Sequence, residues 1–192
     1  KKRLLSMFLC LCMLLTMVPA ALAAGTTGTA APATEDEGET SGNQITASTT
    51  TLTTGNCVLE SDVTLTSGAL KVEANNEVTL NLNGKKLTNQ AGANTIEVAA
   101  GGTLTIEGPG TVDNVSHQKA AVNNSGTVVL NGGTYTRSQE KGTSEEDSGS
   151  NSYYTILNHG TMTINEGVTV NQGENRAGKF SSLIENGWYN GN

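Results

Sequence analysis

The block Gly-Thr-Leu-Thr-Ile at residues 102–106 returns as Gly-Thr-Val-Val-Leu at 126–130 and as Gly-Thr-Met-Thr-Ile at 160–164. Each copy alternates apolar and polar residues with the two-residue period of a β-strand, and a glycine-bearing turn follows it. A single short unit of this kind cannot bury its own apolar face, so regular repetition indicates stacked units. The block therefore predicts an all-β fold, a parallel β-helix (solenoid) that winds right-handed. An antiparallel β-sandwich is the alternative fold.

The repeats can be aligned on the glycine that begins each block. Residues two and four positions after it, and four and six before it, share one strand face and should point inward. On this register the successive coils are anchored at Ser61, Val78, Gly102, Gly126, Gly160 and Gly187, which predicts about five to six coils. Cys57 is expected to be buried in the first coil, and asparagines near the corners, such as Asn124 and Asn158, are expected to stack along the axis.

The N-terminal region has the three-part layout of a secretory signal peptide. A basic start, Lys1 to Arg3, precedes an apolar run from Leu4 to Val18, and Ala21-Leu22-Ala23 supplies a cleavage signal. Residues 1–24 are therefore predicted to be a signal peptide, with a membrane anchor as the alternative. Residues 25–45, rich in Thr, Ala and Glu, are predicted to be a flexible spacer.

Residues 46–192 are then assigned to the parallel β-helix, with a polar insertion at 138–152 that contains no apolar residue. We expect the solenoid to be truncated at its C-terminus and the protein to be secreted. Attachment to a cell wall would then depend on a missing C-terminal region.

Charge and cysteine content exclude several classes of function. Without the signal peptide the chain keeps 8 basic against 18 acidic residues. This acidic balance disfavours nucleic acid and anionic membrane surfaces as partners. Cys57 alone remains outside the signal peptide, so no internal disulfide is possible, and no cofactor or metal site is predicted.

Three stretches carry a resemblance to known proteins: VTLNLNGKKLTN (78–89), GTLTIEGPGTV (102–112) and GTVVLNGGTYT (126–136). They resemble the right-handed parallel β-helix regions of exported, adhesin-like surface proteins of gut-type Firmicutes. There is also a distant likeness to pectin-lyase-like β-helices.

The resemblance implies a secreted or cell-surface module for adhesion or glycan binding, noncatalytic in this chain. Glycans or host extracellular-matrix proteins would be its partners. Part of an extracellular polysaccharide lyase or glycoside hydrolase is the first alternative, and a passive structural stalk is the second.

Catalytic clusters are not evident in the sequence. Hydrolysis of polysaccharides needs paired carboxylates, and the aspartate motifs of polygalacturonases are missing; Asn158-His159-Gly160 matches only a fragment of their histidine motif. The acids nearest the repeated turns, Glu107, Asp113 and Glu166, do not align into a ladder. No catalytic residue is therefore predicted.

Candidate ligand-binding residues fall in two places. Trp188 and Tyr153 have outward parity and could stack on a sugar ring. The polar insertion adds an acidic cluster of Glu145, Glu146 and Asp147. Together these five residues are the predicted ligand-binding surface.

Overall fold

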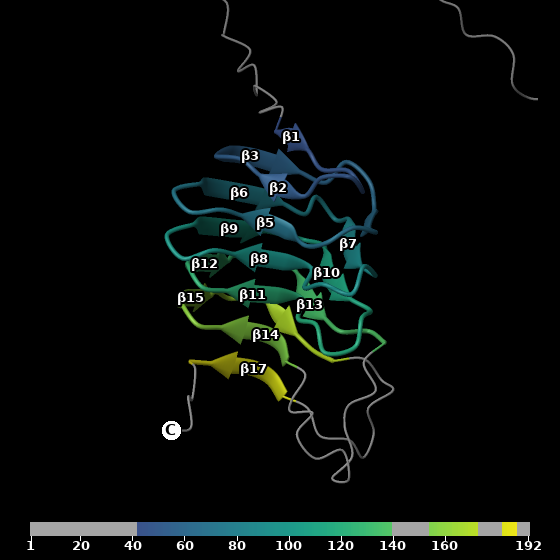
Figure 1. Cartoon of the computed structure of the whole chain (residues 1–192), viewed down its shortest axis with the longest axis vertical. Helices are drawn as coiled ribbons and strands as arrows, with labels where there is room; N and C mark the ends of the chain where they lie inside the picture. The colour runs from purple at the N-terminus through teal and green to yellow at the C-terminus, as the bar shows by residue number, and fades with distance from the viewer. Residues whose placement is uncertain (1–41, 140–153, 173–181, 188–192) are drawn as a thin grey trace, which may run out of the picture. The chain divides into compact units, whose positions relative to one another are not determined.

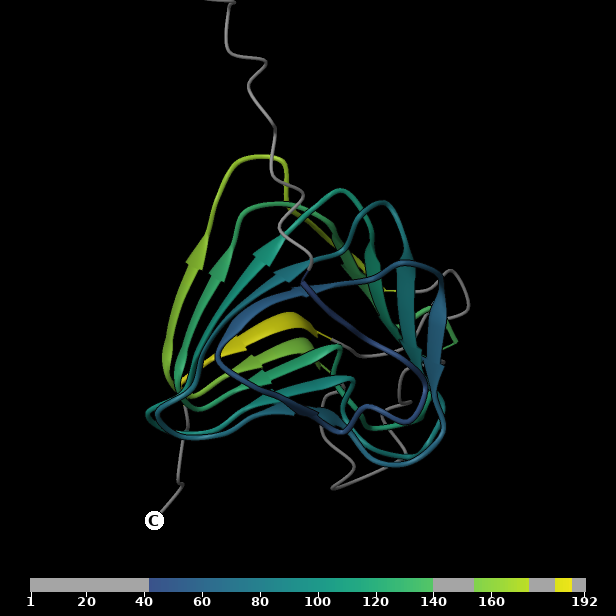
Figure 2. The ribbon, with the colours of Figure 1, turned by 90° about the horizontal axis from the view of Figure 1, so that it is seen from above.

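The computed structural model describes residues 42–139, 154–172 and 182–187. Within them the chain forms three parallel sheets whose strands follow one another in a fixed cycle (Figure 1). Viewed from the N-terminal end, the chain runs clockwise from sheet to sheet as it recedes, so the solenoid winds right-handed (Figure 2). The predicted parallel β-helix is confirmed.

Sheet A consists of β1 (Asn43–Gln44), β3 (Gly55–Val58), β6 (Glu77–Asn81), β9 (Thr103–Glu107), β12 (Thr127–Leu130) and β15 (Thr161–Ile164). Sheet B consists of β2 (Thr51–Leu52), β5 (Leu70–Val72), β8 (Ile96–Val98), β11 (Val122–Asn124), β14 (Tyr154–Asn158) and β17 (Ser182–Asn186). Sheet C consists of β4 (Val63–Leu65), β7 (Lys86–Asn89), β10 (Thr111–Asn114), β13 (Thr134–Thr136) and β16 (Thr169–Val170). The order B–A–C repeats five times between β2 and β16, which agrees with the five to six coils expected.

The core is a set of apolar ladders inside the three sheets. In sheet A, Leu80, Ile106 and Leu130 occupy equivalent positions of consecutive coils, and each is fully buried. Cys57 is 2% exposed and pairs with Leu80 in the same ladder. Backbone hydrogen bonds run between coils, so each short strand inside a sheet is satisfied by its neighbours on both sides.

The solenoid begins earlier than the predicted boundary at residue 46. Strand β1 pairs with β3, and Ile45 is 2% exposed and donates its N–H to the carbonyl of Val58. The last residues of the predicted 25–45 spacer therefore belong to the first coil, because Ile45 gains burial there. The predicted signal peptide (1–24) and residues 25–41 lie outside the described residues.

Part of the sequence-derived alignment between coils is wrong by two residues. Val122 pairs with Ile96, not with Val98, and Val78 pairs with Leu104, not with Gly102. For Val122 the reason is that four residues (99–102) separate β8 from β9, but only two (125–126) separate β11 from β12. The turn before β6 (73–76) has four residues as well, so the shift of Val78 has a different origin: that coil has no Gly-Thr pair, and Val78 is the wrong anchor.

The two terminal anchors, Ser61 and Gly187, are also wrong. Cys57 lies in sheet A and Val63 in sheet C, so the two do not flank one position of a single face. In the last coil Ile184, not Leu183, is the partner of Ile156.

Asparagines close the corner between sheets B and A in the later coils. The Asn124 side-chain amide donates to Oδ1 of Asn158 at 2.7 Å, and Asn158 donates to Oδ1 of Asn186 at 2.5 Å. The Asn124 Oδ1 also accepts the N–H of Gly126 at 2.9 Å. The expected stacking of Asn124 and Asn158 is confirmed, and its role here is structural.

Tyr135 makes stability sensitive to alkaline pH. The ring is fully buried, its hydroxyl donates to the carbonyl of Gly132 at 3.1 Å, and burial raises the pKa of the phenol above its ordinary value of about 10. The contribution of this group to stability is fully present below about pH 10 and is lost as pH rises above it, because only the unfolded chain ionises readily.

Unfolding in urea between pH 8 and 11 should therefore show a falling free energy above about pH 10. The Tyr135→Phe variant should lack this part of the slope. The Cys57→Ala background is appropriate for both, because burial also raises the pKa of that thiol. Equal slopes with and without the Tyr135 hydroxyl would contradict the assignment.

Candidate functional site

The five predicted ligand-binding residues are not placed by the structure. Glu145, Glu146, Asp147 and Tyr153 belong to the 140–153 segment and Trp188 to the 188–192 segment, all outside the described residues. The described surface instead presents two polar groupings, one on the outer face of sheet B and one on the outer face of sheet C.

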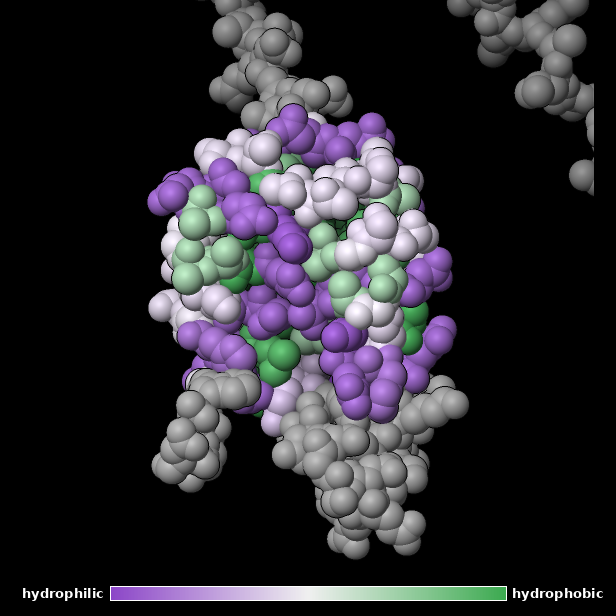
Figure 3. Space-filling model, viewed as in Figure 1, coloured by the Kyte–Doolittle hydropathy of each residue, from purple (hydrophilic) through white to green (hydrophobic). Residues whose placement is uncertain are grey.

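The outer face of sheet B carries a shallow hollow of about 240 Å³. Its floor is a row of side chains from three consecutive coils, Lys71 on β5, Glu97 on β8 and Asn123 on β11, which are partners across the parallel ladder. Glu73 and Ser125 line its side toward sheet A. Figure 3 shows hydrophilic side chains gathered over the middle of this face.

The row offers donors and acceptors to one small ligand. Lys71 is an exposed cation, and one carboxylate oxygen of Glu97 accepts from the Asn94 amide at 2.9 Å, which holds that side chain in place. The Asn123 Oδ1 is buried and has no hydrogen-bond partner in the described part of the chain. A buried acceptor without a partner is costly, and a donor from a ligand would satisfy it.

The size of the hollow limits what it could hold. Pockets for drug-sized ligands have volumes of roughly 300–1,000 Å³, and this hollow is smaller and open. One or two rings of a polar ligand would fit, with neighbouring parts outside. Adjacent strands are about 4.8 Å apart, so a single ring can reach side chains of two coils.

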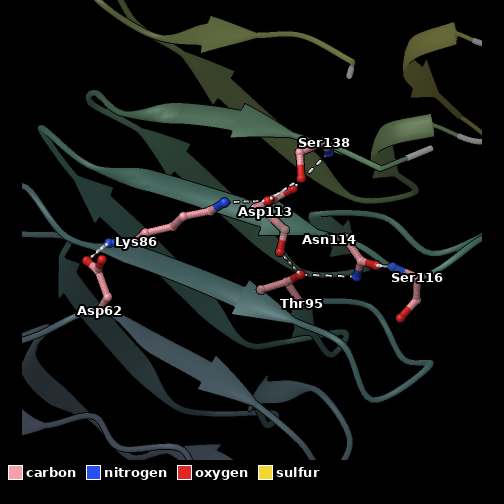
Figure 4. A network of polar contacts seen from close by, with 7 residues as sticks. All are labelled: Asp62, Lys86, Thr95, Asp113, Asn114, Ser116 and Ser138. Carbon is pink, nitrogen blue, oxygen red and sulfur yellow. Dashed lines mark hydrogen bonds and ion pairs between the residues drawn. The ribbon is translucent and has the colours of Figure 1, made fainter. Parts of the chain in front are cut away.

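The second grouping centres on Asp113 in β10 (Figure 4). This carboxylate is fully buried on the outer side of sheet C. Its Oδ2 lies 2.7 Å from Nζ of Lys86, and it accepts from the Ser138 hydroxyl at 2.6 Å and the Ser138 N–H at 2.9 Å. Asp62, which lies one coil before Lys86, accepts the backbone N–H of Lys86 at 2.8 Å.

The network continues through the backbone to the corner between sheets C and B. The Thr95 hydroxyl donates to the Asp113 carbonyl at 2.7 Å and accepts from Asn114 at 3.1 Å, and Asn114 Oδ1 accepts the Ser116 N–H at 2.9 Å. The carbonyl and both carboxylate oxygens of Asp113 are thus used, and the carboxylate joins Lys86 of the preceding coil to Ser138 of the next one. Since Ser138 is the first residue of the predicted insertion, the network fixes the point where that segment leaves the coil.

Removing the Asp113 carboxylate should destabilise the protein. The Asp113→Ala variant loses three charge-assisted contacts, and we expect a loss of about 2 kcal/mol in unfolding free energy. Urea titration would measure it. Ser138→Ala, which removes one of the three contacts, should cost about half as much. A loss no larger for Asp113→Ala than for Ser138→Ala would show that Lys86 adds nothing.

The other titratable groups considered in the sequence do not converge on these sites. Glu107 and Glu166 are exposed at the ends of different coils, and the pairing of β9 with β12 places Asn131, not an acid, level with Glu107. His159 is exposed at a corner, and its Nε2 lies 4.0 Å from Oε1 of Glu185. Within residues 42–139, 154–172 and 182–187, no group of three or more His, Cys, Asp or Glu side chains is placed to hold a metal ion.

Sequence reasoning missed both groupings. In the sequence Asp113 is only an isolated acid near a turn, and no motif marks Lys71, Glu97 and Asn123 as a row. The alternation of β5, β8 and β11 does give each of these residues outward parity, so the row could have been found. The contact of Lys86 with Asp113 is diagonal between coils, and finding it requires the correct register.

No protein-family model, no curated protein and no solved structure matches this chain. In the part of the chain that the structure describes, no helix has the length and hydrophobicity needed to cross a membrane. What the geometry defines is therefore an architecture, a right-handed parallel β-solenoid, together with the polar hollow on its sheet B face.

Proposed function

We propose that this chain is an extracellular, noncatalytic module for adhesion through glycan binding, and that the sheet B hollow is its binding site. The observation that carries the proposal is the buried Oδ1 of Asn123, an acceptor with no hydrogen-bond partner among the described residues, at the edge of a row that also offers Lys71 and Glu97. Sugar hydroxyl groups both donate and accept, so adjacent hydroxyls on one ring match an amide, a carboxylate and an ammonium group in a row.

The mixed charge of the row favours a neutral sugar. Lys71 provides one positive charge, and Glu73 and Glu97 provide two negative charges. An anionic sugar would meet both carboxylates, and the acidic balance of the whole chain would add to the repulsion. The signal-peptide pattern at residues 1–24 supports an extracellular setting, where such ligands are found.

Binding of the full chain to an array of neutral oligosaccharides is the direct test. Glu97→Gln should weaken binding to the best ligand at least tenfold, because it removes a charged acceptor from the row. Glu60→Gln, an exposed acid in the turn between β3 and β4, is the matched control and should leave binding unchanged. Failure of the folded chain to bind any glycan would refute the function, and equal binding by the two variants would refute the site.

A further inference from the structure

The outer face of sheet A carries a regular array of threonines. Two columns run along the solenoid axis, because outward residues of consecutive coils are ladder partners. We call the following set the threonine face: Thr79, Thr103, Thr105, Thr127, Thr161 and Thr163. Val129 occupies the one place in β9, β12 and β15 where the two columns lack a threonine, and valine has the same branched shape.

The threonine face is periodic in two directions. Alternate residues of a parallel strand are about 6.6 Å apart, and neighbouring coils are about 4.8 Å apart. Threonine is branched at Cβ, so few rotamers are open to it and each hydroxyl is held near one position. The face therefore presents a fixed net of hydroxyl and methyl groups that costs little entropy to order on binding.

The hydroxyls of the threonine face are not used in folding. Among the described residues, none of the six donates to or accepts from another protein group. Threonines elsewhere behave differently: Thr95 donates to the Asp113 carbonyl and Thr155 donates to the Asn171 carbonyl. The six free hydroxyls remain available to a ligand outside.

The chemistry of the face excludes several ligands. The outward positions of β12 and β15 carry no charge. Glu77 occupies the β6 end of one column and Glu107 lies beside the other, so a polyanion is repelled and a polycation meets only these two carboxylates. No aromatic side chain occupies an outward position of sheet A in the described strands, so a single soluble sugar chain has no ring to stack on. A ligand must itself be flat, neutral and repeating to meet many weak groups at once.

We infer that the threonine face binds the flat surface of an ordered, insoluble neutral polysaccharide. In such a solid, extended sugar chains lie side by side and present hydroxyl and C–H groups in a fixed repeat. The hydroxyls of the face pair with hydroxyls of the solid, while its methyl groups and Val129 cover the C–H groups. Ice also presents hydroxyl groups in a fixed lattice but has no C–H groups, so arrest of ice growth is the contrary outcome of the experiment below.

The inference rests on the proposed glycan-binding function but assigns a second surface, separate from the sheet B hollow. Many identical weak contacts on a rigid net give strong retention on a solid and negligible binding to a free chain, because only the solid engages both columns together. The hollow is expected to show the opposite preference.

Sedimentation with microcrystalline cellulose and with α-chitin, compared with soluble oligomers of the same sugars, tests this. The probe is the full chain, and Thr105→Lys is the test variant, because it places a charged chain in the centre of the face. We expect it to reduce partition onto the solid at least tenfold. Thr64→Lys, at an exposed outward position of β4 in sheet C, is the control. Thermal unfolding of both variants should match that of the parent chain, since both positions point outward.

The outcomes separate the two proposals. If Thr105→Lys reduces partition onto the solid while Thr64→Lys and Glu97→Gln leave it unchanged, the result supports binding by the threonine face. Equal partition of Thr105→Lys and the parent chain overturns it and leaves the glycan-binding function standing. No binding to any solid or soluble glycan overturns both. Arrest of ice growth that Thr105→Lys abolishes, without binding to either solid, would reassign the face to a water lattice and overturn the inference.

Discussion

The substitution Val122→Asp should abolish cooperative folding of the solenoid. Val122 is fully buried in β11 between Ile96 of the preceding coil and Ile156 of the following coil. A carboxylate at this point stands between apolar side chains and loses its hydration, so it must stay charged at a desolvation cost or take up a proton at a cost. A penalty of about 5 kcal/mol is expected, which is comparable to the whole stability of many domains.

Circular dichroism during heating would measure the effect. The parent chain should show a cooperative loss of β signal, and Val122→Asp should show none. Val129→Asp is the matched control, because it makes the same change in the next strand, β12, at an outward, half-buried position. Its cost should stay below about 1 kcal/mol. A cooperative transition of Val122→Asp with the same midpoint as Val129→Asp would contradict the burial of Val122, and loss of the transition in Val129→Asp alone would mean that the inward and outward faces have been exchanged.

Inward and outward faces could be predicted from the sequence even where the pairing of coils was wrong. Val98 and Val122 were aligned although their true partners are Asn124 and Ile96. The error was two residues, and side chains in a strand alternate with a period of two, so both valines were still assigned to the inner face. Burial confirms this, since Val98 is 2% exposed and Val122 is fully buried.

The length of the turns could not be predicted from the same pattern. Whether two or four residues separate sheets B and A depends on how the corner is closed. In the coil with the short turn, Asn124 closes the corner by accepting the N–H of Gly126, and Asn158 and Asn186 continue this column. In the coil with the long turn, Val98 stands in the place of Asn124 and no such bond can form. Asparagine or valine at this position is therefore the feature of the sequence that distinguishes the two-residue turn from the four-residue turn.

The polar groupings depend on this register more strongly than the core does. An apolar ladder accepts any apolar inward residue. Shifting one strand by two residues along its neighbour therefore leaves a similar core. The contact of Lys86 with Asp113 joins particular residues of neighbouring coils and disappears if the alignment moves. The row of Lys71, Glu97 and Asn123 depends on pairing in the same way. Sequence patterns alone therefore predict the fold better than its surface sites.

Gly126→Ala should be the second most damaging change, for a different physical reason. The glycine sits in the two-residue turn between β11 and β12, and its backbone is not in the left-handed region. A Cβ there would lie closer than 3.0 Å to the backbone oxygens of Gly102 and Ala99 in the preceding coil. The Gly102 oxygen already accepts the N–H of Thr127 at 2.9 Å, so relieving the clash stretches the hydrogen bonds that join the two coils. We expect a loss of about 3 kcal/mol in unfolding free energy, at the upper end for overpacking.

Urea unfolding of three variants would separate this steric cost from other effects of replacing a glycine. Ser125→Ala, at the exposed neighbouring position, should change stability by less than about 0.5 kcal/mol. Gly84→Ala tests backbone strain alone, because that glycine has a φ of +70° and no atom within 4 Å of an added Cβ; a cost of about 1 kcal/mol is expected. If Gly126→Ala costs no more than Gly84→Ala, the coils can move apart at this corner, and the close approach of Gly102, Gly126 and Gly160 does not limit the sequence there. A clearly larger cost would explain why the repeated block begins with glycine in all three copies.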